Sequence, residues 1–529
     1  MQLKKIADIA ACGTKSRILF FIALALYLTG IPFSHFMMSL AGVILVLQWL
    51  FDRNLLEKLK SFFHSKVALC CLLVYAVHVV WLISSVNMTY ALSDLWIKIP
   101  LLFIPLIFFT SKPLSEKEFQ VLLQIYVAGV LIASLLGFIA YQTGTLEDKR
   151  DMALFISYIR FGINICFAVF VAFSLLIRGR LSLWQKTVLV VVLCWFLFFL
   201  IYSGSVTAIA LFFAAGIIGT VRLVMSSKNK FFRRIILCSF VVLITGLSTY
   251  LYYIVRQYFK VDFSIETAAK YTADGNPYSH NMEKQHIENG SYIYTYVSEK
   301  ELEEAWNKRS DIKYNDTDEN GFPIRTTLIR YLNSKKLTKD RIGVEALTDE
   351  DISNVRQGIA NVVYTYRLNI AGRIYSLMWE LNDYCCTGSV VGYSFPQRLE
   401  LWKCSLGSIG KHPWFGVGTG DGKDVFAQEL REQKSPLANK GMRSHNQYLT
   451  FLILFGVVGL TLILFSILYP VVALRKTKDT LFWIFFSIML LSMLTEDTLE
   501  PQDGVTFFAF FYSFFLFLAP KKKSEQVDE

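Results

Sequence analysis

Long apolar runs separated by short polar gaps make up most of the chain. A run of about 20 apolar residues with few charges is long enough to cross a bilayer as a helix. The runs predict twelve membrane helices, and the first two are the least regular because they are short and share a turn at Gly30, Ile31 and Pro32. The predicted helices cover residues 18–33, 37–51, 67–84, 95–110, 119–141, 153–177, 185–202, 205–224, 233–254, 446–472, 479–495 and 504–520.

Lysine and arginine collect in every second gap between these runs, whereas the other short gaps carry almost no net positive charge. Loops on the cytoplasmic side of a membrane are enriched in these two residues. We therefore expect a multi-pass protein of the inner (cytoplasmic) membrane, with both termini in the cytoplasm and one large loop in the periplasm of a Gram-negative host. The basic residues of the expected cytoplasmic gaps include Lys4, Lys5, Lys15, Arg17, Lys58, Lys60, Lys112, Lys117, Arg178, Lys186, Arg222, Lys230, Arg475, Lys476 and Lys521 to Lys523.

This topology divides the chain into four parts. Residues 1–254 form an N-terminal membrane domain of about nine helices, and residues 446–520 form a C-terminal membrane domain of three. Residues 255–445 form the extracytoplasmic (periplasmic) loop domain, and residues 521–529 form a cytoplasmic tail. The expected fold class is an all-α polytopic membrane protein with about 12 transmembrane helices and one large, mainly helical loop domain.

The acidic and basic residues of the large loop nearly cancel, which is typical of a folded polar domain and not of a charged tail. Helical stretches are expected over 299–308, 326–334 and 349–381. Aromatic and β-branched residues cluster over 292–297 and predict a strand. Turn-rich breaks over 274–277 and 315–323 separate these elements.

Composition supports the membrane interpretation, because 54% of the 529 residues are hydrophobic. The net charge of +11 could suggest a nucleic-acid partner. Since the basic excess lies in short loops between apolar runs, we expect membrane lipids and no nucleic acid as partners. The nine cysteines show no metal-binding spacing. Cys385, Cys386 and Cys404 fall in the expected outer domain, where one disulfide is an open alternative.

His445, directly before the run 446–472, is the first candidate for chemistry. Histidine accepts a proton near neutral pH, which suits a general base. A lone histidine at a membrane interface more often only caps a helix. Here it is followed by Asn446, a supporting candidate, then by nine residues, Gly456, two residues and Gly459. This pattern resembles the signature of O-antigen ligases, whose relatives, the Wzy-type polymerases and the bacterial O-oligosaccharyltransferases, share a related domain.

Further stretches carry the same resemblance. Residues 398–402 read Arg-Leu-Glu-Leu-Trp and precede a glycine-rich turn over 410–420, similar to the arginine helix and turn of that family. Arg160, in Ser-Tyr-Ile-Arg-Phe-Gly, is similar to the family's arginine at the outer end of a middle span. The turn 203–207 stands where many relatives carry an arginine that this chain lacks, which puts a role for that turn in doubt. Segments within 288–343 look like the insertion of Bacteroidetes-type members.

The resemblance implies a GT-C-like membrane glycosyltransferase that is metal-independent and needs no cofactor. The implied donor is a glycan on undecaprenyl diphosphate, and the implied acceptor is a hydroxyl of lipid A-core at the outer face of the inner membrane. Direct displacement by that hydroxyl would invert the anomeric configuration. The same signature leaves two alternatives open: a Wzy-type polysaccharide polymerase, which uses another glycan as acceptor, and a protein O-oligosaccharyltransferase.

Arg160 and Arg398 are the expected partners of the donor's diphosphate. A guanidinium binds phosphate oxygens with two N–H groups and stays charged, and a fixed charge stabilises the negative charge of a leaving diphosphate. Arg160 lies about six residues inside its predicted span, where an arginine usually faces a polar cavity, although it could also snorkel to the interface. Arg398 lies on an amphipathic stretch over 396–409, and an ordinary surface arginine is its alternative.

Two other groups could support the site. Gly416 and Gly418 could present backbone N–H groups to a phosphate as an anion nest, although glycines after a helix more often only form a turn. Glu496, with Asp497 and Glu500, forms a carboxylate cluster on the same side as the histidine. These carboxylates could orient the imidazole or a sugar hydroxyl, but position alone favours a solvated loop.

A transporter or flippase is the remote alternative, because twelve spans also suit secondary transporters. Those proteins are commonly built from two similar halves with coupling charges near the membrane midplane. Here nine predicted spans precede the large loop and three follow it, without symmetry. The intramembrane charges, Arg160 and Lys98, are expected near the outer face. The pattern therefore favours an enzyme.

Overall fold

The computed structural model describes most of the chain as two compact units. The first unit consists of Met1–Asn229 and Arg398–Glu529, and the second is Lys230–Gln397. The predicted tail 521–529, with Lys521 to Lys523, lies outside the described residues. The described residues are 2–52, 54–146, 148–179, 181–226, 229–261, 265–266, 268–282, 286–366, 370–476 and 479–520.

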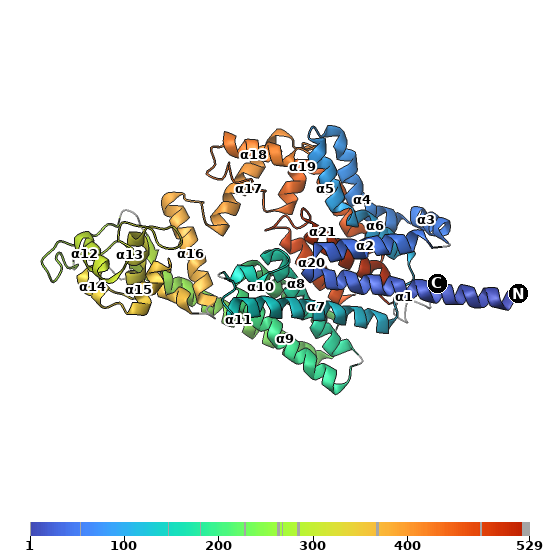
Figure 1. Ribbon diagram of the computed structural model, residues 1–529, viewed down its shortest axis with the longest axis horizontal. Helices are drawn as coiled ribbons and strands as arrows, with labels where there is room; N and C mark the ends of the chain where they lie inside the picture. The colour runs from blue at the N-terminus through green and yellow to red at the C-terminus, as the bar shows by residue number, and fades with distance from the viewer. Residues whose placement is uncertain are drawn as a thin grey trace. The chain divides into compact units, whose positions relative to one another are not determined.

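Helices make up most of the first unit (Figure 1). Many of them pack against one another, α1 against α2 and α7, and α4 against α19. Most of α17 belongs to this unit. Its elements are α1 (Gln2–Phe33), α2 (His35–Leu50), α3 (Leu55–His64), α4 (Lys66–Val80), η1 (Trp81–Ser84), α5 (Met88–Lys98), α6 (Pro100–Thr110), α7 (Glu116–Gln142), η2 (Lys149–Met152), α8 (Tyr158–Arg178), α9 (Leu183–Ser203), α10 (Val206–Ser226), α17 (Ser394–Lys411), α18 (Gly422–Glu432), α19 (Gln447–Ala473), α20 (Thr480–Ser492), α21 (Gln502–Ser513) and η5 (Phe514–Leu518).

Nine helical segments within the described ranges are long and apolar enough to cross a membrane. The chain is therefore a mostly helical, multi-pass membrane protein. These segments are Ser16–Phe33, Lys66–Ser84, Met88–Thr110, Glu116–Gln142, Tyr158–Arg178, Leu183–Ser203, Val206–Met225, Arg233–Phe259 and Gln447–Ala473.

The other three predicted spans, 37–51, 479–495 and 504–520, are shorter than expected. The first corresponds to α2, which passes only together with α3 as a pair bent by 103°. The helix α20 has 13 residues and is about 20 Å long, less than the roughly 30 Å of a bilayer's hydrocarbon core. The predicted count of twelve spans is therefore not confirmed.

Two helices begin at other residues than predicted, and this changes where two charged residues lie along them. The helix α8 begins at Tyr158 and not at 153, so Arg160 lies in the first turn and not deep inside a span. The span predicted over 95–110 begins at Met88, so Lys98 lies midway along it and not near its end. The charges of Asp94 and Lys98 interrupt the apolar run, but the two side chains form an ion pair inside the protein.

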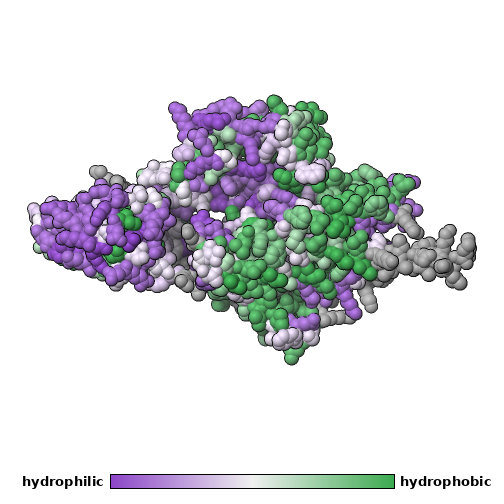
Figure 2. All heavy atoms as spheres, in the orientation of Figure 1, coloured by the Kyte–Doolittle hydropathy of each residue, from purple (hydrophilic) through white to green (hydrophobic). Residues whose placement is uncertain are grey.

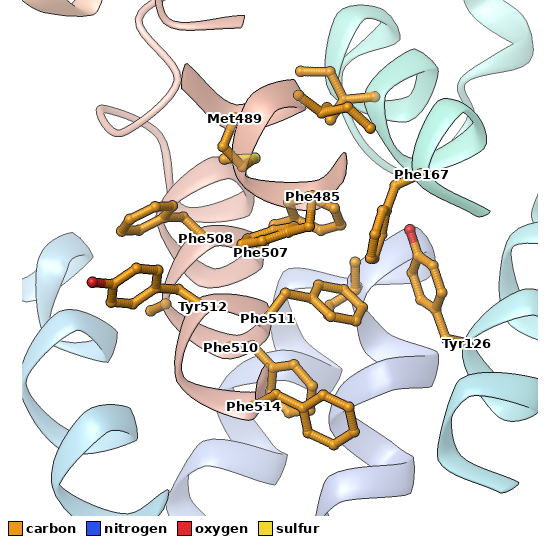
Figure 3. Close-up of a cluster of buried hydrophobic side chains, with 14 of the residues drawn as sticks. Tyr126, Phe167, Phe485, Met489, Phe507, Phe508, Phe510, Phe511, Tyr512 and Phe514 are labelled. Carbon is orange, nitrogen blue, oxygen red and sulfur yellow. The ribbon is translucent and has the colours of Figure 1, made fainter. Parts of the chain in front are cut away.

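Aromatic packing holds α20 and α21 in the bundle (Figure 3). The ring of Phe511 on α21 lies 4.9 Å, between centroids, from those of Tyr126 on α7 and Phe167 on α8. Phe485 on α20 lies 5.8 Å from Phe511. Since lipid tails are as apolar as the helices, close packing holds membrane helices together, and each aromatic pair adds about 0.5–1.5 kcal/mol. This packing fixes the positions of both ends of the α20–α21 loop.

The helix α19 is broken at Gly456, whose φ of 62° lies in the left-handed region. The turn after α17 closes the break, and inside a membrane such freed backbone groups must find partners within the protein. A Cβ atom on Gly456 would lie 2.3 Å from the carbonyl carbon of Trp414, so only glycine fits. Four N–H groups donate to carbonyls across the break: Val417 to Ile453, Gly418 to Leu454, Val457 to Pro413 and Val458 to Trp414.

The second unit begins with a membrane-length helix and continues as a polar domain. The helix α11 packs against elements of that domain, so the compact unit starts before the predicted boundary at 255. Figure 2 shows that hydrophilic residues cover α12 to α15. The elements are α11 (Lys230–Phe259), β1 (Ile287–Glu288), β2 (Ser291–Tyr292), α12 (Glu299–Arg309), α13 (Ile324–Ser334), α14 (Arg341–Glu345), α15 (Asp349–Arg356), η3 (Val362–Thr365) and α16 (Ile370–Thr387).

Two of the three helices predicted for this domain are confirmed, 299–308 by α12 and 326–334 by α13. The third prediction, a continuous helix over 349–381, is wrong. The helix α15 ends at Arg356, and Gly358 then turns the chain with a φ of 77°. One turn-forming residue inside a helical pattern ended the helix there.

The strand predicted over 292–297 is wrong. Among the described residues, the one pair of strands is the hairpin β1–β2, whose turn is formed by Asn289 and Gly290. Both residues have positive φ, as the two central positions of a tight hairpin turn require. The predicted turns 274–277 and 315–323 are confirmed, because a short antiparallel bridge closes each.

The polar part of the second unit has its own core. Trp306, Leu328 and Tyr331 are fully buried at its centre. Cys385 and Cys386 on α16 are free thiols, and Cys404 in the first unit is also free.

Candidate active site on the α20–α21 loop

The acidic residues of the α20–α21 loop are buried. Glu496, Asp497 and Glu500 are 4%, 5% and 3% exposed. The solvated loop that position alone favoured is therefore wrong. The short helices on either side, fixed by their aromatic contacts, hold the loop inside the protein, where buried carboxylates need partners. Each of these three carboxylates has such partners.

Glu496 joins two of the residues singled out from the sequence. Its Oε1 accepts a hydrogen bond of 2.6 Å from Nη2 of Arg398. Its Oε2 lies 3.5 Å from Nδ1 of His445. Arg398 also donates from Nε to the carbonyl of Thr495 at 3.1 Å. The predicted amphipathic stretch 396–409 is helical, as part of α17, and it delivers the guanidinium to this loop.

Asp497 fixes the backbone of the histidine. Its Oδ2 accepts a 3.0 Å hydrogen bond from the N–H of His445, and its Oδ1 accepts one of 2.6 Å from Thr450. His445 has a φ of 50°, a left-handed conformation that costs free energy in any residue other than glycine. Such a conformation persists only where surrounding contacts impose it, and Asp497 supplies that contact. The carbonyl of Asp497 also accepts from Nη2 of Arg160 at 3.2 Å.

Arg160 is held by three partners. Besides the carbonyl of Asp497, its Nη1 donates to Oγ of Ser157 at 2.9 Å, and its Nε lies 3.3 Å from Oδ1 of Asp503. The side chain is only 16% exposed. An arginine that snorkels freely to the interface would not be fixed in this way, so the snorkelling alternative is not supported. The α20–α21 loop thus brings together three residues singled out from the sequence, because its consecutive residues 495–497 contact Arg160, Arg398 and His445.

A second group of charges surrounds Glu500, and sequence reasoning missed most of it. Its Oε2 lies 3.3 Å from Nζ of Lys98 and 3.6 Å from Nη1 of Arg443. Its Oε1 accepts from Nε2 of Gln447 at 3.0 Å. One signal was available: Asp94 and Lys98 stand four residues apart in an apolar segment, the spacing of an ion pair on one helix face. Arg443 stands two residues before the histidine but carries no local signal.

These pairings set the pKa values of the loop carboxylates. Burial raises the pKa of Glu496, but the hydrogen bond from His445 and the charge of Arg398 outweigh burial and hold that pKa below its ordinary value. For Glu500, burial is likewise outweighed, by Lys98 and Arg443, and the pKa is lowered. Burial dominates for Asp497 and raises its pKa. Glu496 and Glu500 therefore remain ionised at neutral pH.

The remaining supporting candidates have structural partners. Asn446 caps α19, because its Oδ1 accepts from the N–H groups of Tyr448 and Leu449. The N–H of Gly416 donates to the carbonyl of His412, and that of Gly418 donates to the broken helix. These contacts favour the turn over the anion nest. Within the described part of the chain, no group of three or more His, Cys, Asp or Glu residues could hold a metal ion.

The fold and the site together define a class of protein. It is a multi-pass membrane protein with a cluster of buried, paired charges near the ends of several helices. A family model described as O-Antigen ligase matches residues 359–464. Residues 359–464 are therefore similar to the O-antigen ligase family. The match covers about a fifth of the chain and contains Arg398 and His445, whereas Arg160 and Glu496 lie outside it. No curated protein matches the sequence.

Proposed function

We propose that this protein is a ligase-type glycosyltransferase that moves a glycan from undecaprenyl diphosphate to a hydroxyl of lipid A-core. The single observation that carries the proposal is the contact of Glu496 with both His445 and Arg398. It couples a proton acceptor to a cation that suits a diphosphate. The reaction is placed at the outer face of the inner membrane, following the distribution of basic residues along the chain.

His445 acts as the general base. When Nδ1 carries the proton and faces Glu496, Nε2 has a free lone pair that can accept the proton of the acceptor hydroxyl. The ionised Glu496 then stabilises the imidazolium that forms. The acceptor oxygen bonds to the anomeric carbon as the bond from that carbon to the diphosphate breaks. The diphosphate leaves with the electron pair, and the configuration inverts.

Arg160 and Arg398 bind the diphosphate. Both contact the backbone of residues 495–497, so the two guanidinium groups are held near the same loop as the base. A guanidinium matches phosphate oxygens with paired N–H groups, and its fixed charge stabilises the charge that grows on the leaving group. The residues present suit displacement without a metal ion, and we propose a metal-independent, inverting reaction.

The test uses a deletion strain complemented with full-length variants and read on a lipopolysaccharide gel. His445→Ala should abolish glycan transfer to the core, while the glycan stays on its carrier and the protein stays in the membrane. His64→Ala, a change at an exposed histidine, is the matched control and should restore transfer. Transfer at the wild-type rate by His445→Ala would remove the histidine from the mechanism.

The same gel separates the polymerase alternative. A strain that lacks a ligase has no polymer on the core, whereas a strain that lacks a polymerase has a core that bears one repeat unit. A core with one repeat unit in the deletion strain would assign the site to a polymerase. An unchanged lipopolysaccharide together with unglycosylated envelope proteins would assign it to a protein O-oligosaccharyltransferase.

A further inference from the structure

The turn between α17 and α18, residues 412–418, pairs with the inside of a membrane span. The predicted extracytoplasmic domain, 255–445, includes this turn. In the structure, however, its backbone closes the break in α19 at Gly456, nine residues after the first residue of that helix, Gln447. The turn therefore lies alongside a membrane helix and not beyond its end.

The length of α19 gives a depth for the turn. A helix rises about 1.5 Å per residue, so Gly456 lies about 14 Å along α19 from Gln447. The span Gln447–Ala473 has 27 residues and is about 40 Å long, roughly 10 Å more than the hydrocarbon core of a bilayer. An α19 centred in the core therefore holds its break about 8 Å below the boundary of the core.

The helix α4 gives a second measure of the same depth. Its span with η1, Lys66–Ser84, has 19 residues and is about 30 Å long, which matches the thickness of the core. Trp81 donates from Nε1 to the carbonyl of Phe415. This tryptophan lies three residues before Ser84 in η1, about 6 Å from the end of the span. Both helices thus place the turn several ångströms inside the hydrocarbon.

The backbone of the turn meets the condition for irregular chain at membrane depth. Water is absent there, so each polar backbone group needs a partner within the protein. The carbonyls of residues 412–415 all have one. They accept, in chain order, from the N–H groups of Gly416, Val457 and Val458 and from Nε1 of Trp81. A turn in water could leave such groups to the solvent.

The side chains at the tip of the turn are apolar and exposed. Trp414 and Phe415 are 66% and 63% exposed. Val457 of α19 and Val80 of α4 are also exposed, so the apolar surface continues onto two membrane spans. Lys411, the charged residue directly before the turn, is paired with carboxylates of α18. An exposed apolar surface of this kind is typical of contact with a membrane.

We propose that the tip of this turn, residues 413–416, is inserted in the bilayer, where Trp414 and Phe415 contact acyl chains of the outer leaflet, on the side of His445. The occupant of the surface is lipid, because the surface continues the exposed sides of α4 and α19 at the depth of the hydrocarbon. The inference does not depend on the proposed reaction. Since α17 runs from the loop contact of Arg398 to this turn, the turn anchors that helix in the leaflet.

Photolabelling of the full-length protein in phosphatidylglycerol nanodiscs tests the insertion. A benzophenone amino acid, which reacts with C–H bonds on irradiation, replaces Trp414, Phe465 or Phe322, one at a time. Phe465, exposed within the span of α19, is the positive control, and Phe322, exposed on the polar domain, is the matched negative control. Mass spectrometry should find phospholipid attached at 414 as often as at 465 and about tenfold more often than at 322, because hydrocarbon surrounds only the first two.

Fluorescence quenching measures the depth with a variant that keeps an apolar ring in the turn. Trp414→Phe removes one tryptophan, so the emission lost between wild type and variant belongs to Trp414. Lipids brominated near the headgroup end of the acyl chain should quench this emission more strongly than lipids brominated near the methyl end. The reason is that a depth of about 8 Å lies in the outer half of a leaflet whose hydrocarbon is about 15 Å thick.

Three results would overturn the inference, and none of them depends on glycan transfer. Lipid labelling at 414 no greater than at 322 would place the turn in water. Cross-links from 414 to another part of the chain, without lipid adducts, would mean that protein covers the surface. If neither brominated lipid quenched Trp414, the ring would lie outside the hydrocarbon.

Discussion

The carboxylate of Glu496 lies 3.5 Å from Nδ1 of His445, on the side of the ring away from Nε2. The same carboxylate accepts a hydrogen bond from Arg398. A single side chain therefore orients the proposed base and one proposed phosphate ligand. Its replacement should affect both.

Glu496→Gln should lower the rate of glycan transfer by about 10²-fold or more, because general base catalysis contributes about 10²–10⁴-fold. The amide fills the same space but cannot stabilise an imidazolium. The rate is measured with full-length protein in nanodiscs and a lipid-linked glycan donor. Glu432→Gln is the matched control, since Glu432 is exposed and its partners, Lys411 and Gln428, also lie at the surface. Equal losses in both variants would show that the effect is not specific to the site.

The pH dependence of stability gives a separate test of the same carboxylate. The pKa of Glu496 is lowered in the folded protein, so its contribution to stability is present above the ordinary glutamate pKa of about 4.3 and is lost as the pH falls through the lower, folded value. The difference in melting temperature between wild type and Glu496→Gln should persist from about pH 8 down to pH 5 and shrink below that range. A difference that shrinks already between pH 7 and pH 6 would contradict a lowered pKa.

Arg160→Lys should lose most transfer activity although the charge is retained. Three separate nitrogens of Arg160 contact Ser157, Asp497 and Asp503, and a lysine offers a single point charge without the planar fork. The expected loss is about 10-fold or more in kcat, since a charge-assisted hydrogen bond contributes roughly 1.5–3 kcal/mol. Arg178→Lys, at the other end of the same helix, should be active. Full activity of Arg160→Lys would reduce the arginine to a structural role.

His445 and Arg398 could be predicted from the sequence because each stands in a pattern of nearby residues. The histidine is followed by Asn446 and, after nine intervening residues, by Gly456. The structure gives a physical reason for both residues. Asn446 caps the helix, and Gly456 allows the backbone to break against the turn after α17. The spacing of these residues along the chain reflects the geometry of one short segment, so the sequence alone was enough to recognise the pattern.

The burial of Glu496, Asp497 and Glu500 could not be predicted in this way. A short acidic loop between two apolar runs reads as solvated, because no residue within the loop indicates its partners. Those partners, Arg398 and Lys98 among them, stand far away in the sequence. The loop is buried because α20 and α21 are short and packed by aromatic rings, and apolar runs indicate where helices lie more reliably than where they end.

Gly456→Ala should prevent folding of the membrane unit. A methyl group there would lie 2.3 Å from the backbone of Trp414, and the residue's φ is positive. Relieving the clash or the backbone strain would therefore cost substantial folding free energy. The yield of monodisperse protein after detergent extraction should fall severalfold. Gly216→Ala on α10 is the matched control, because an added Cβ meets nothing within 4 Å. If Gly456→Ala gave the wild-type yield, the close contact between the break in α19 and the turn after α17 would be contradicted.

Lys339→Met should stabilise the polar domain of the second unit at pH 7. Burial lowers the pKa of Lys339 to about 8, so at pH 7 the buried ammonium costs about 3 kcal/mol relative to an ordinary lysine. Methionine removes that cost but leaves Asn333, the hydrogen-bond partner of Nζ, unpaired at about 1 kcal/mol, for a net gain of about 1–2 kcal/mol.

The sign of this effect should depend on pH. Between the folded pKa of about 8 and the unfolded value of about 10.4, the unfolded chain binds more protons, so wild-type stability rises with pH. The advantage of Lys339→Met should therefore shrink from pH 7 to pH 9.5, as measured by hydrogen exchange of α12 to α15 in the full-length protein, with wild type and variant compared at each pH. Lys308→Met, at an exposed lysine on α12, should show no such trend. An advantage that grows with pH would mean that the buried amine is not the destabilising group.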